Sequence, residues 1–225
     1  MTSNAYTQIF SSLFPFWHKL PAHEQELLYK STLPVSYKKG QIIHDGTECT
    51  GMILVQKGCL RAYMLSDEGK EVTLYRLRDG NICMLSASCV LQSITFDVFI
   101  EAEEASEALL INGKVFADMA ERNAPMKIYA LETAVGRFSN VMWIMQQILF
   151  MSLDKRLALY LLEESVVNNS NTITATHDQI ARHLGSAREV LEHAGDYFAG
   201  RTKVAGDLVV GCFDGVRIIY STFFQ

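Results

Sequence analysis

The sequence predicts an α+β protein in three parts: a β-domain, a long amphipathic helix and a C-terminal pair of short helices. Three patterns indicate this: glycine-punctuated β-rich runs before residue 112, an apolar repeat over residues 128–149, and two helical segments joined by a glycine within residues 174–191. The 225 residues are 49% hydrophobic and 20% charged, enough to bury a core. The formal net charge of −5 argues against a strongly basic, non-specific nucleic-acid coat.

The β-domain is expected between Val35 and about Asn112, after a helix that begins near Pro21 and ends at Pro34. Glycines at positions 40, 46, 58, 69 and 80 separate short runs, as in a sandwich or barrel of short strands. The turn at residues 66–70 predicts a hairpin in which Gly69 takes a positive φ. The predicted strands are Gln41–His44, Met52–Gln56, Leu60–Leu65, Val72–Leu77, Phe96–Ile100 and Ala108–Ile111.

A long helix follows Asn123, with Pro125 in its first turn. Its apolar residues alternate at spacings of three and four, which is the pattern of a heptad seam. The seam residues are Ile128, Leu131, Val135, Phe138, Met142, Met145 and Leu149. This stripe could pack on the chain's own β-domain. A dimer seam is favoured, because so long a helix beside a small β-domain has little intramolecular surface to cover it.

The most informative stretch runs from Thr174 to Leu191. Thr176 can cap a short helix over residues 177–183 whose residues Ile180 and Ala181 point inward. Gly185 stands where that helix must stop sharply, and Ser186 can cap a second helix. Two short helices joined through a glycine are typical of a helix-turn-helix, although an ordinary helical hairpin would show the same pattern.

The second helix would carry the residues that read DNA. Arg188 and Glu189 fall at its N-terminal end, the end that enters a major groove. Arginine can donate two hydrogen bonds to guanine, and glutamate can accept one from cytosine. Arg182 lies outside the turn and is expected to meet the DNA backbone. The candidate DNA contacts are Thr176, Gln179, Arg182, Ser186, Arg188, Glu189 and His193.

The order of these parts resembles the Crp/Fnr family of bacterial transcription regulators. The resemblance rests on residues 67–71 and 77–80 in the β-domain, the seam helix, residues 179–190, and residues 215–218, which are similar to the last strand of a wing. It implies an N-terminal double-stranded β-helix (a β-roll or jelly roll) over residues 1–122 that resembles a cyclic-nucleotide-binding domain. It also implies a dimerisation helix over 123–151 and a winged helix-turn-helix over 152–225. The implied partners are a pseudo-palindromic operator in double-stranded DNA, a second copy of the chain, RNA polymerase and a small-molecule effector.

The sequence departs from the family's cyclic-nucleotide site. Family members that bind cyclic nucleotides carry a Gly-Glu pair for the ribose and an Arg-Ser/Thr pair for the phosphate. Here those places fall at about Met84-Leu85 and Phe96-Asp97. No basic residue lies between Arg78 and Lys114, so the phosphate would meet Asp97, Glu101, Glu103 and Glu104 without a counter-charge. Cyclic AMP is therefore not the expected effector.

A largely apolar effector, or none, is expected instead. The candidate pocket residues are Met84, Leu85, Cys89, Phe96 and Leu131. Cys83 and Cys89 could form a thiol sensor or soft-metal site, or they could be small buried hydrophobes, which is the favoured interpretation. The family's iron–sulfur members use an N-terminal cysteine cluster, and residues 1–48 contain no Cys. No metal and no cofactor is expected.

The predicted function is a homodimeric, sequence-specific DNA-binding regulator. The alternative is a small-molecule-binding module whose helix-turn-helix has lost DNA binding. The acidic balance after Glu189 favours this alternative, and the intact segment Gln179–Glu189 opposes it; from residue 154 onward there are nine acidic and seven basic residues. No motif of an enzyme active site is found, so an enzyme is not expected. With no signal peptide and no apolar stretch of about 18 residues, a cytoplasmic protein with reduced thiols and no membrane partner is expected.

Overall fold

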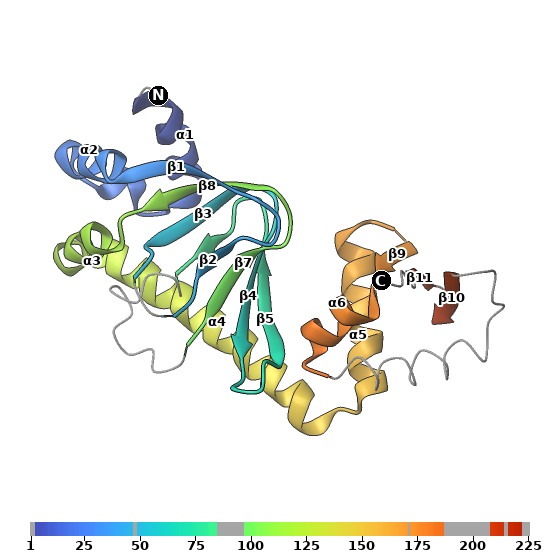
Figure 1. Cartoon of the computed structure of the whole chain (residues 1–225). Coiled ribbons are helices and arrows are strands. Elements are labelled where there is room, and N and C mark those ends of the chain that lie inside the picture. The colour runs from blue at the N-terminus through green and yellow to red at the C-terminus, as the bar shows by residue number, and fades with distance from the viewer. Residues whose placement is uncertain are drawn as a thin grey trace. The chain divides into compact units, whose positions relative to one another are not determined.

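The computed structural model describes residues 3–46, 49–84, 97–170, 172–186, 208–213 and 216–221 (Figure 1). The chain divides into two compact units, one of residues 1–64 and 74–141 and the other of residues 65–73 and 142–225. The first contains most of the β-domain and the larger part of the long helix. The sequence-based boundaries at residues 122/123 and 151/152 stay predictions.

The chain begins with helices that the sequence pattern only partly predicted. Helix α1 (Ser3–Leu13) and the short 3-10 helix η1 (Trp17–Lys19) precede α2 (Ala22–Lys30), which has Pro21 at its N-cap as expected. The prediction that this helix ends at Pro34 was wrong. Strand β1 (Thr32–Tyr37) has already begun there, and Pro34 pairs with Leu109. A proline is tolerated at this position because β1 is the edge strand of its sheet.

Two four-stranded, largely antiparallel sheets form a jelly-roll-like β-domain, which confirms the predicted fold class (Figure 1). One sheet has the order β1-β8-β3-β6, with β3 (Met52–Lys57), β6 (Ile82–Cys83) and β8 (Ser106–Ile111). The other has the order β2-β7-β4-β5, with β2 (Ile42–His44), β4 (Leu60–Leu65), β5 (Glu71–Leu77) and β7 (Phe99–Ala102). The sequence did not predict β1 or β6, and it placed the start of β7 three residues early, at Phe96 instead of Phe99.

The turn between β4 and β5 has the predicted conformation. Gly69 has a φ of 79°, and its N–H donates to the Ser66 carbonyl at 2.9 Å. The Ser66 N–H donates to the Lys70 carbonyl at 2.9 Å and closes the hairpin. A positive φ of this size is strained for residues other than glycine, which explains the glycine here.

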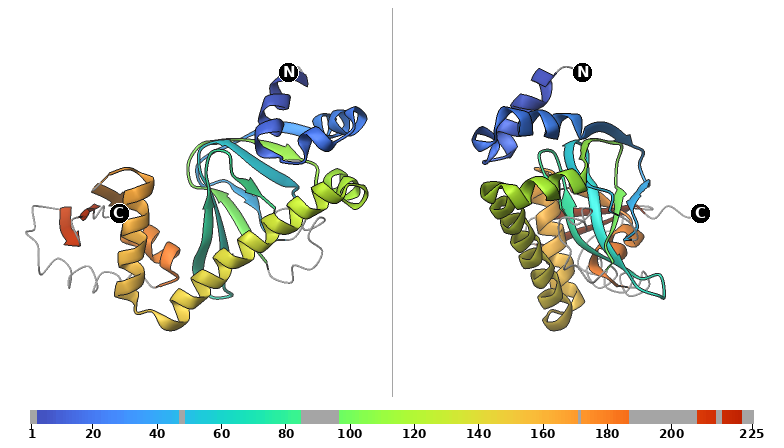
Figure 2. Two further views of the ribbon diagram at one scale, coloured as in Figure 1. Left: turned by 180° about the vertical axis from the view of Figure 1, so that it is seen from behind. Right: turned by 90° about the vertical axis from the view of Figure 1, so that its left-hand side faces the viewer.

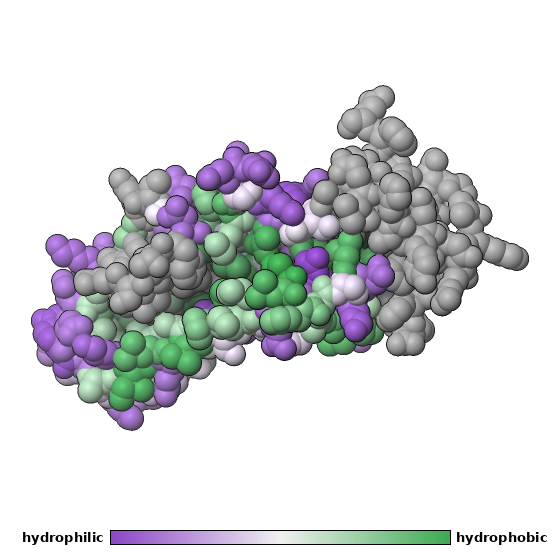
Figure 3. All heavy atoms as spheres, turned by 90° about the horizontal axis from the view of Figure 1, so that it is seen from below, coloured by the Kyte–Doolittle hydropathy of each residue, from purple (hydrophilic) through white to green (hydrophobic). Residues whose placement is uncertain are grey.

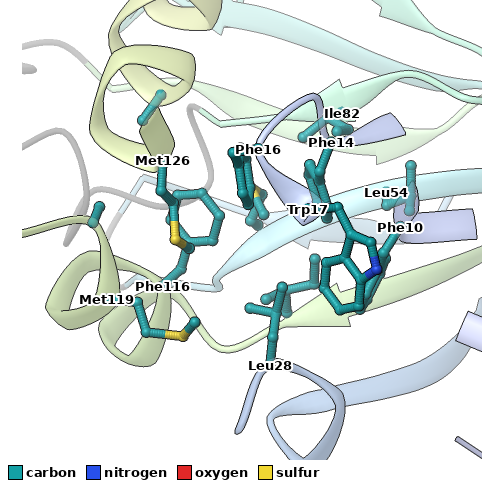
Figure 4. Packing of buried hydrophobic residues seen from close by; sticks show 14 of the residues in the cluster. Phe10, Phe14, Phe16, Trp17, Leu28, Leu54, Ile82, Phe116, Met119 and Met126 are labelled. Carbon is teal, nitrogen blue, oxygen red and sulfur yellow. The ribbon is translucent and has the colours of Figure 1, made fainter. Parts of the chain in front are cut away.

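Strand β3 is buried on both faces because a different cluster covers each one. Met52 and Leu54 pack against the aromatic side chains Phe10, Phe14, Phe16 and Trp17, together with Phe116 and Met119 (Figure 4). We call this the aromatic cluster. Ile53 and Val55 point the other way, into the cluster between the two sheets. A continuous apolar run in a short strand is the sequence pattern that such two-sided burial produces.

Two consecutive helices complete the first unit. In α3 (Gly113–Arg122), the side chain of Asn112 caps the first turn by accepting from the Val115 N–H at 3.1 Å. Helix α4 (Ala124–Phe150) has 27 residues, a length of about 40 Å at 1.5 Å per residue. Figure 2 shows it as one continuous helix. Met126 and Ala130 anchor its first turns in the aromatic cluster.

The second unit contains a small mixed sheet and two helices. Helix α5 (Leu153–Val167) precedes β9 (Thr172–Ala175), α6 (His177–Leu184), β10 (Leu208–Phe213) and β11 (Val216–Ser221). Strand β11 pairs antiparallel with β10 and parallel with β9. Residues from α5, β9 and α6 form one buried cluster, whose members include Leu157, Tyr160, Leu161, Ile173, Ile180 and Leu184.

Candidate nucleic-acid interface and effector site

The N-terminus of α6 is closed by a reciprocal cap. The Gln179 N–H donates to the Thr176 hydroxyl at 3.2 Å, and the Thr176 N–H donates to Gln179 Oε1 at 2.9 Å. This capping box satisfies two backbone N–H groups that a helix start otherwise leaves without partners. The sequence analysis identified the Thr176 cap but not the return bond from Gln179. The helix start is therefore fixed by its own side chains.

The C-terminus of α6 stops where the sequence predicts. Gly185 is left-handed, with a φ of 62°, and the N–H of Ser186 donates to the Ala181 carbonyl at 3.0 Å. A second contact comes from α5, where Arg156 Nη1 donates to the Leu184 carbonyl at 2.7 Å. A cation beside the last carbonyls of a helix is favourable because those carbonyls carry partial negative charge. Burial lowers the pKa of Arg156.

Helix α6 separates an apolar face from a polar one. Ile180 and Ala181 are buried, as predicted, and Ala181 is small enough to let α5 approach closely. On the other face, Arg182 Nε lies 3.1 Å from Asp178 Oδ2. That nitrogen makes no hydrogen bond, so the pair is an electrostatic contact without aligned N–H geometry. The side chains of Arg182 and Asp178 are 40% and 60% exposed, so solvent screens this pair.

Helix α4 exposes a continuous apolar stripe. The exposed fractions are 54% for Ile128, 54% for Leu131, 66% for Val135, 65% for Phe138, 44% for Met142, 46% for Met145 and 65% for Leu149. These are all seven seam residues, and none of them is packed into the clusters of its own chain. Hydrophobic side chains gather on the face of the molecule seen from below, the side on which α4 lies in Figure 1 (Figure 3).

A cation from α4 reaches the β-domain. The guanidinium carbon of Arg137 lies 4.7 Å from the ring centre of Tyr75 on β5. Its Nη2 donates to the Ile82 carbonyl on β6 at 3.1 Å. The side chain is thus held from two sides, by a cation–π contact and by a backbone acceptor.

Two other arginines of the β-domain pair with glutamates. Arg61 Nε lies 2.9 Å from Glu101 Oε1, with side-chain exposures of only 3% and 14%. Arg76 donates to both carboxylate oxygens of Glu103, at 2.6 and 3.0 Å. Burial alone would raise the pKa of Glu103, but the hydrogen bonds and charge of Arg76, together with Cys59 and the charge of Arg61, outweigh it and the pKa is lowered. Glu101 and Glu103 therefore have counter-charges from Arg61 and Arg76, which lie outside the stretch between Arg78 and Lys114 in which the sequence shows no basic residue.

Comparison with known structures decides the family. A protein from Eubacterium rectale, assigned to the Crp/Fnr family of transcriptional regulators, is 41% identical and superposes with a TM-score of 0.81. The match covers 92% of this chain and 93% of that one. The chain belongs to the Crp/Fnr family. The family model for the cyclic nucleotide-binding domain matches residues 34–123 of this Crp/Fnr chain, which extend from within β1 to β8 and include helix α3.

More distant solved structures share the fold. The c-di-GMP-responsive global regulator CLP of Xanthomonas campestris is 16% identical, with a TM-score of 0.68, over 90% of this chain and all of that one. FixK2 of Bradyrhizobium japonicum is 17% identical, with a TM-score of 0.59, over 83% and 90% of the two chains. At these identities the likeness shows the fold alone. No curated protein sequence matches the chain.

The predicted DNA contacts of this Crp/Fnr chain fall partly inside the described structure. Thr176 is the N-cap of α6, Gln179 and Arg182 lie on the helix, and Ser186 follows its left-handed glycine. Arg188, Glu189 and His193 lie outside the described residues, as does the rest of the predicted second helix. The strand predicted from residues 215–218 is present as β11. The turn into the second helix is thus described, and the reading helix stays a prediction.

The predicted effector residues are less closely grouped. Leu85, Cys89 and Phe96 lie outside the described residues. Met84 has no exposed surface and belongs to the aromatic cluster, whereas Leu131 is half exposed on α4. Arg137 could not be predicted as part of this site, because it lies outside the stretch between Arg78 and Lys114 that corresponds to the family's phosphate site. An Arg inside a heptad helix carries no signal that it faces a strand 55 residues away.

Two of the described cysteines are buried. Cys59 and Cys83 form no disulfide and have little or no exposed surface. Burial first, and then the charge of Glu103, raise the pKa of Cys59 to about 12, so its thiol stays protonated. Cys49 is disulfide-bonded to a residue whose side chain is outside the described part, so the expectation of reduced thiols was wrong there.

Among the described residues, no group of three or more His, Cys, Asp or Glu could hold a metal ion. In the same part of the chain, no helix is long and apolar enough to cross a bilayer.

Proposed function

We propose that this Crp/Fnr chain is a homodimeric regulator that binds a pseudo-palindromic operator in double-stranded DNA and acts on RNA polymerase in the cytoplasm. Its β-domain senses a small molecule other than cyclic AMP. The observation that carries the proposal is the turn at Gly185. A capped, half-buried helix ends there in the left-handed geometry that a helix-turn-helix needs before its second helix.

The apolar stripe of α4 supports the dimer. Seven large side chains at heptad spacing are about half exposed, and exposed apolar patches of this kind mark interaction sites. A second copy of the same helix offers the same stripe, so a twofold pair covers both at once. Such a dimer places two recognition helices roughly 34 Å apart, one helical turn of DNA.

The sugar of cyclic AMP fits the β-domain less well than its phosphate does. Arg137 brings a positive charge that the sequence search did not find. However, Met84 stands about where the family's Gly-Glu pair would begin, and its side chain is fully buried in the aromatic cluster. No carboxylate is offered there to the ribose hydroxyls. Calorimetry with cyclic AMP and cyclic GMP should show no binding at physiological concentrations.

A selected-oligonucleotide binding assay tests DNA reading. We expect the full-length protein to enrich a pseudo-palindrome at low salt, with binding that fades steeply as salt rises. Arg188→Ala should cost about 1–3 kcal/mol per half-site and relax one base pair of the motif. Arg182→Ala should weaken all sequences alike and flatten the salt slope by about one. Arg122→Ala, an exposed arginine on α3, is the matched control and should change neither.

A second candidate function is an interaction module without DNA binding. The nine acidic against seven basic residues from residue 154 onward favour it. The same assay separates the two candidates. Failure to enrich any palindrome at low salt, or an enriched motif that Arg188→Ala leaves unchanged, would favour the interaction module.

A further inference from the structure

Two buried hydrogen-bonding groups of the first unit have no nitrogen or oxygen partner among the described residues, and the first of them has only the Cys83 thiol beside it. They are the Tyr75 hydroxyl and the Nε of Arg137. Tyr75 is only 9% exposed, within the cluster between the two sheets. Leaving a buried donor unsatisfied is costly, so each such group needs an explanation, and a bound molecule that supplies the acceptor is one.

The two groups belong to one site. The guanidinium of Arg137 lies 4.7 Å from the centre of the Tyr75 ring, and its Nη2 is bound to the Ile82 carbonyl at 3.1 Å. These contacts fix the plane of the guanidinium and leave Nε unbonded. The neighbourhood is apolar, because Cys83 is fully buried in the same cluster as Tyr75, and Val141 packs against that cluster from α4.

Arg137 differs from Arg61 and Arg76, two other arginines of the first unit, in its ion pairing. Arg61 and Arg76 each pair with a glutamate, at 2.9 and 2.6 Å. Within the described residues, no carboxylate lies within ion-pair distance of Arg137. A half-buried cation in apolar surroundings is stabilised most when an anion joins it.

We propose that Arg137 and Tyr75 bind the carboxylate of a small effector whose remaining part is apolar. The proposal rests on the sensing role of the β-domain proposed above, and it names the chemical class of the ligand. Tyr75 acts as a neutral donor. Burial first, and then the neighbouring Cys83, hold the pKa of its phenol well above the ordinary value, so the proton is retained.

A carboxylate suits the site better than other anions. One guanidinium compensates one negative charge, and its planar fork matches the two oxygens of a carboxylate. The surrounding cluster offers apolar contacts to the rest of the ligand. A cyclic nucleotide also carries one negative charge, but its sugar would meet the buried Met84 side chain where the family places a glutamate.

Calorimetric titration of the full-length protein with matched acids and amides tests the proposal. The probes are benzoate against benzamide and hexanoate against hexanamide, with cyclic AMP as a separate arm. We expect at least one carboxylate to bind more tightly than its neutral amide. Arg137→Gln should weaken that carboxylate by about 10- to 100-fold and leave the amide unchanged, as loss of a charged hydrogen-bonding partner predicts. Arg122→Gln, on the exposed surface of α3, is the control and should bind as the parent protein does.

A second variant keeps the test decisive if Arg137→Gln does not fold. Tyr75→Phe retains the ring that supports Arg137 and removes only the hydroxyl, so it should weaken the carboxylate by about fivefold. Circular dichroism establishes that each variant is folded. The proposal is overturned if neither carboxylate binds better than its amide, if both variants bind as the parent does, or if cyclic AMP alone binds and depends on Arg137. None of these readouts involves DNA, so failure here and failure of DNA binding are distinguishable.

Discussion

Charged substitutions in the seam should convert a dimer to monomers. We consider the double variant Phe138→Glu with Met142→Glu. Fully burying such a side chain stabilises by roughly 1.5–3 kcal/mol. Because Phe138 is 65% and Met142 is 44% exposed in the single chain, covering them adds about 1–2 and about 1 kcal/mol respectively.

The twofold axis doubles this loss. Each residue occurs twice at a twofold interface, so the double variant removes about 4–6 kcal/mol, which raises the dissociation constant by about three to four orders of magnitude. Two buried carboxylates from each chain add to the cost, because like charges would meet without partners. A dimer stable at nanomolar concentration would then be monomeric at micromolar concentration.

Sedimentation velocity at micromolar concentration measures the outcome. Leu33→Glu is the matched control, since Leu33 is 61% exposed on the edge strand β1 and is not a seam residue. It should leave the dimer intact. A parent protein that already sediments as a monomer at this concentration would refute the reasoning, as would a double variant that stays dimeric.

Three further predictions concern the described structure. Thr176→Ala removes the cap of α6 and should lower the free energy of unfolding by about 0.5–2 kcal/mol in a denaturant titration. Cys59 should resist alkylation by iodoacetamide at pH 8 in the folded protein and react on unfolding, because its pKa of about 12 keeps the thiol protonated. The pKa of Glu103 is lower folded than unfolded, so its pairing with Arg76 stabilises the fold above the unfolded value and is lost as the pH falls through the folded one. Glu103→Gln should therefore flatten the acid side of a plot of stability against pH.

Local patterns explain why much of the fold could be predicted from the sequence. Strands β3, β4 and β5 were found within one residue of their bounds, because each is a β-rich run between glycines. The aromatic cluster was missed, since Phe10 and Phe14 show no pattern that says what they cover. The unbroken apolar run Met52–Val55 was the sequence feature that indicated such a cluster. A strand buried on both faces needs one layer from the facing sheet and a second layer on its other side, which here is the aromatic cluster.

The candidate sites also differ in whether they depend on residues close together in the sequence or far apart. The Gly185 turn and the Thr176 cap depend on neighbouring residues, so the sequence was sufficient to place them. Arg137 and Tyr75 come from different elements, and nothing local to either residue indicates that they meet. The pairing of Arg61 with Glu101 was missed for the same reason, since it depends on the register of β4 against β7. Counting the charged residues in one continuous stretch of sequence cannot reveal an ion-pair partner that lies on a distant strand or helix.

Helix α4 takes part in both the proposed dimer and the proposed carboxylate site, because different faces of the helix carry the residues of each. Met126 and Ala130 anchor it in the aromatic cluster, Arg137 reaches Tyr75, and Phe138, the next residue, points outward in the seam. An effector held by Arg137 would therefore bind one residue away from the predicted dimer interface. It can shift the dimer only by the difference between its affinities for the two states of the helix. Since Arg137→Gln alters one face and Phe138→Glu the other, ligand binding and assembly can be measured separately. Coupling between them would appear as a change in carboxylate affinity when the seam alone is broken.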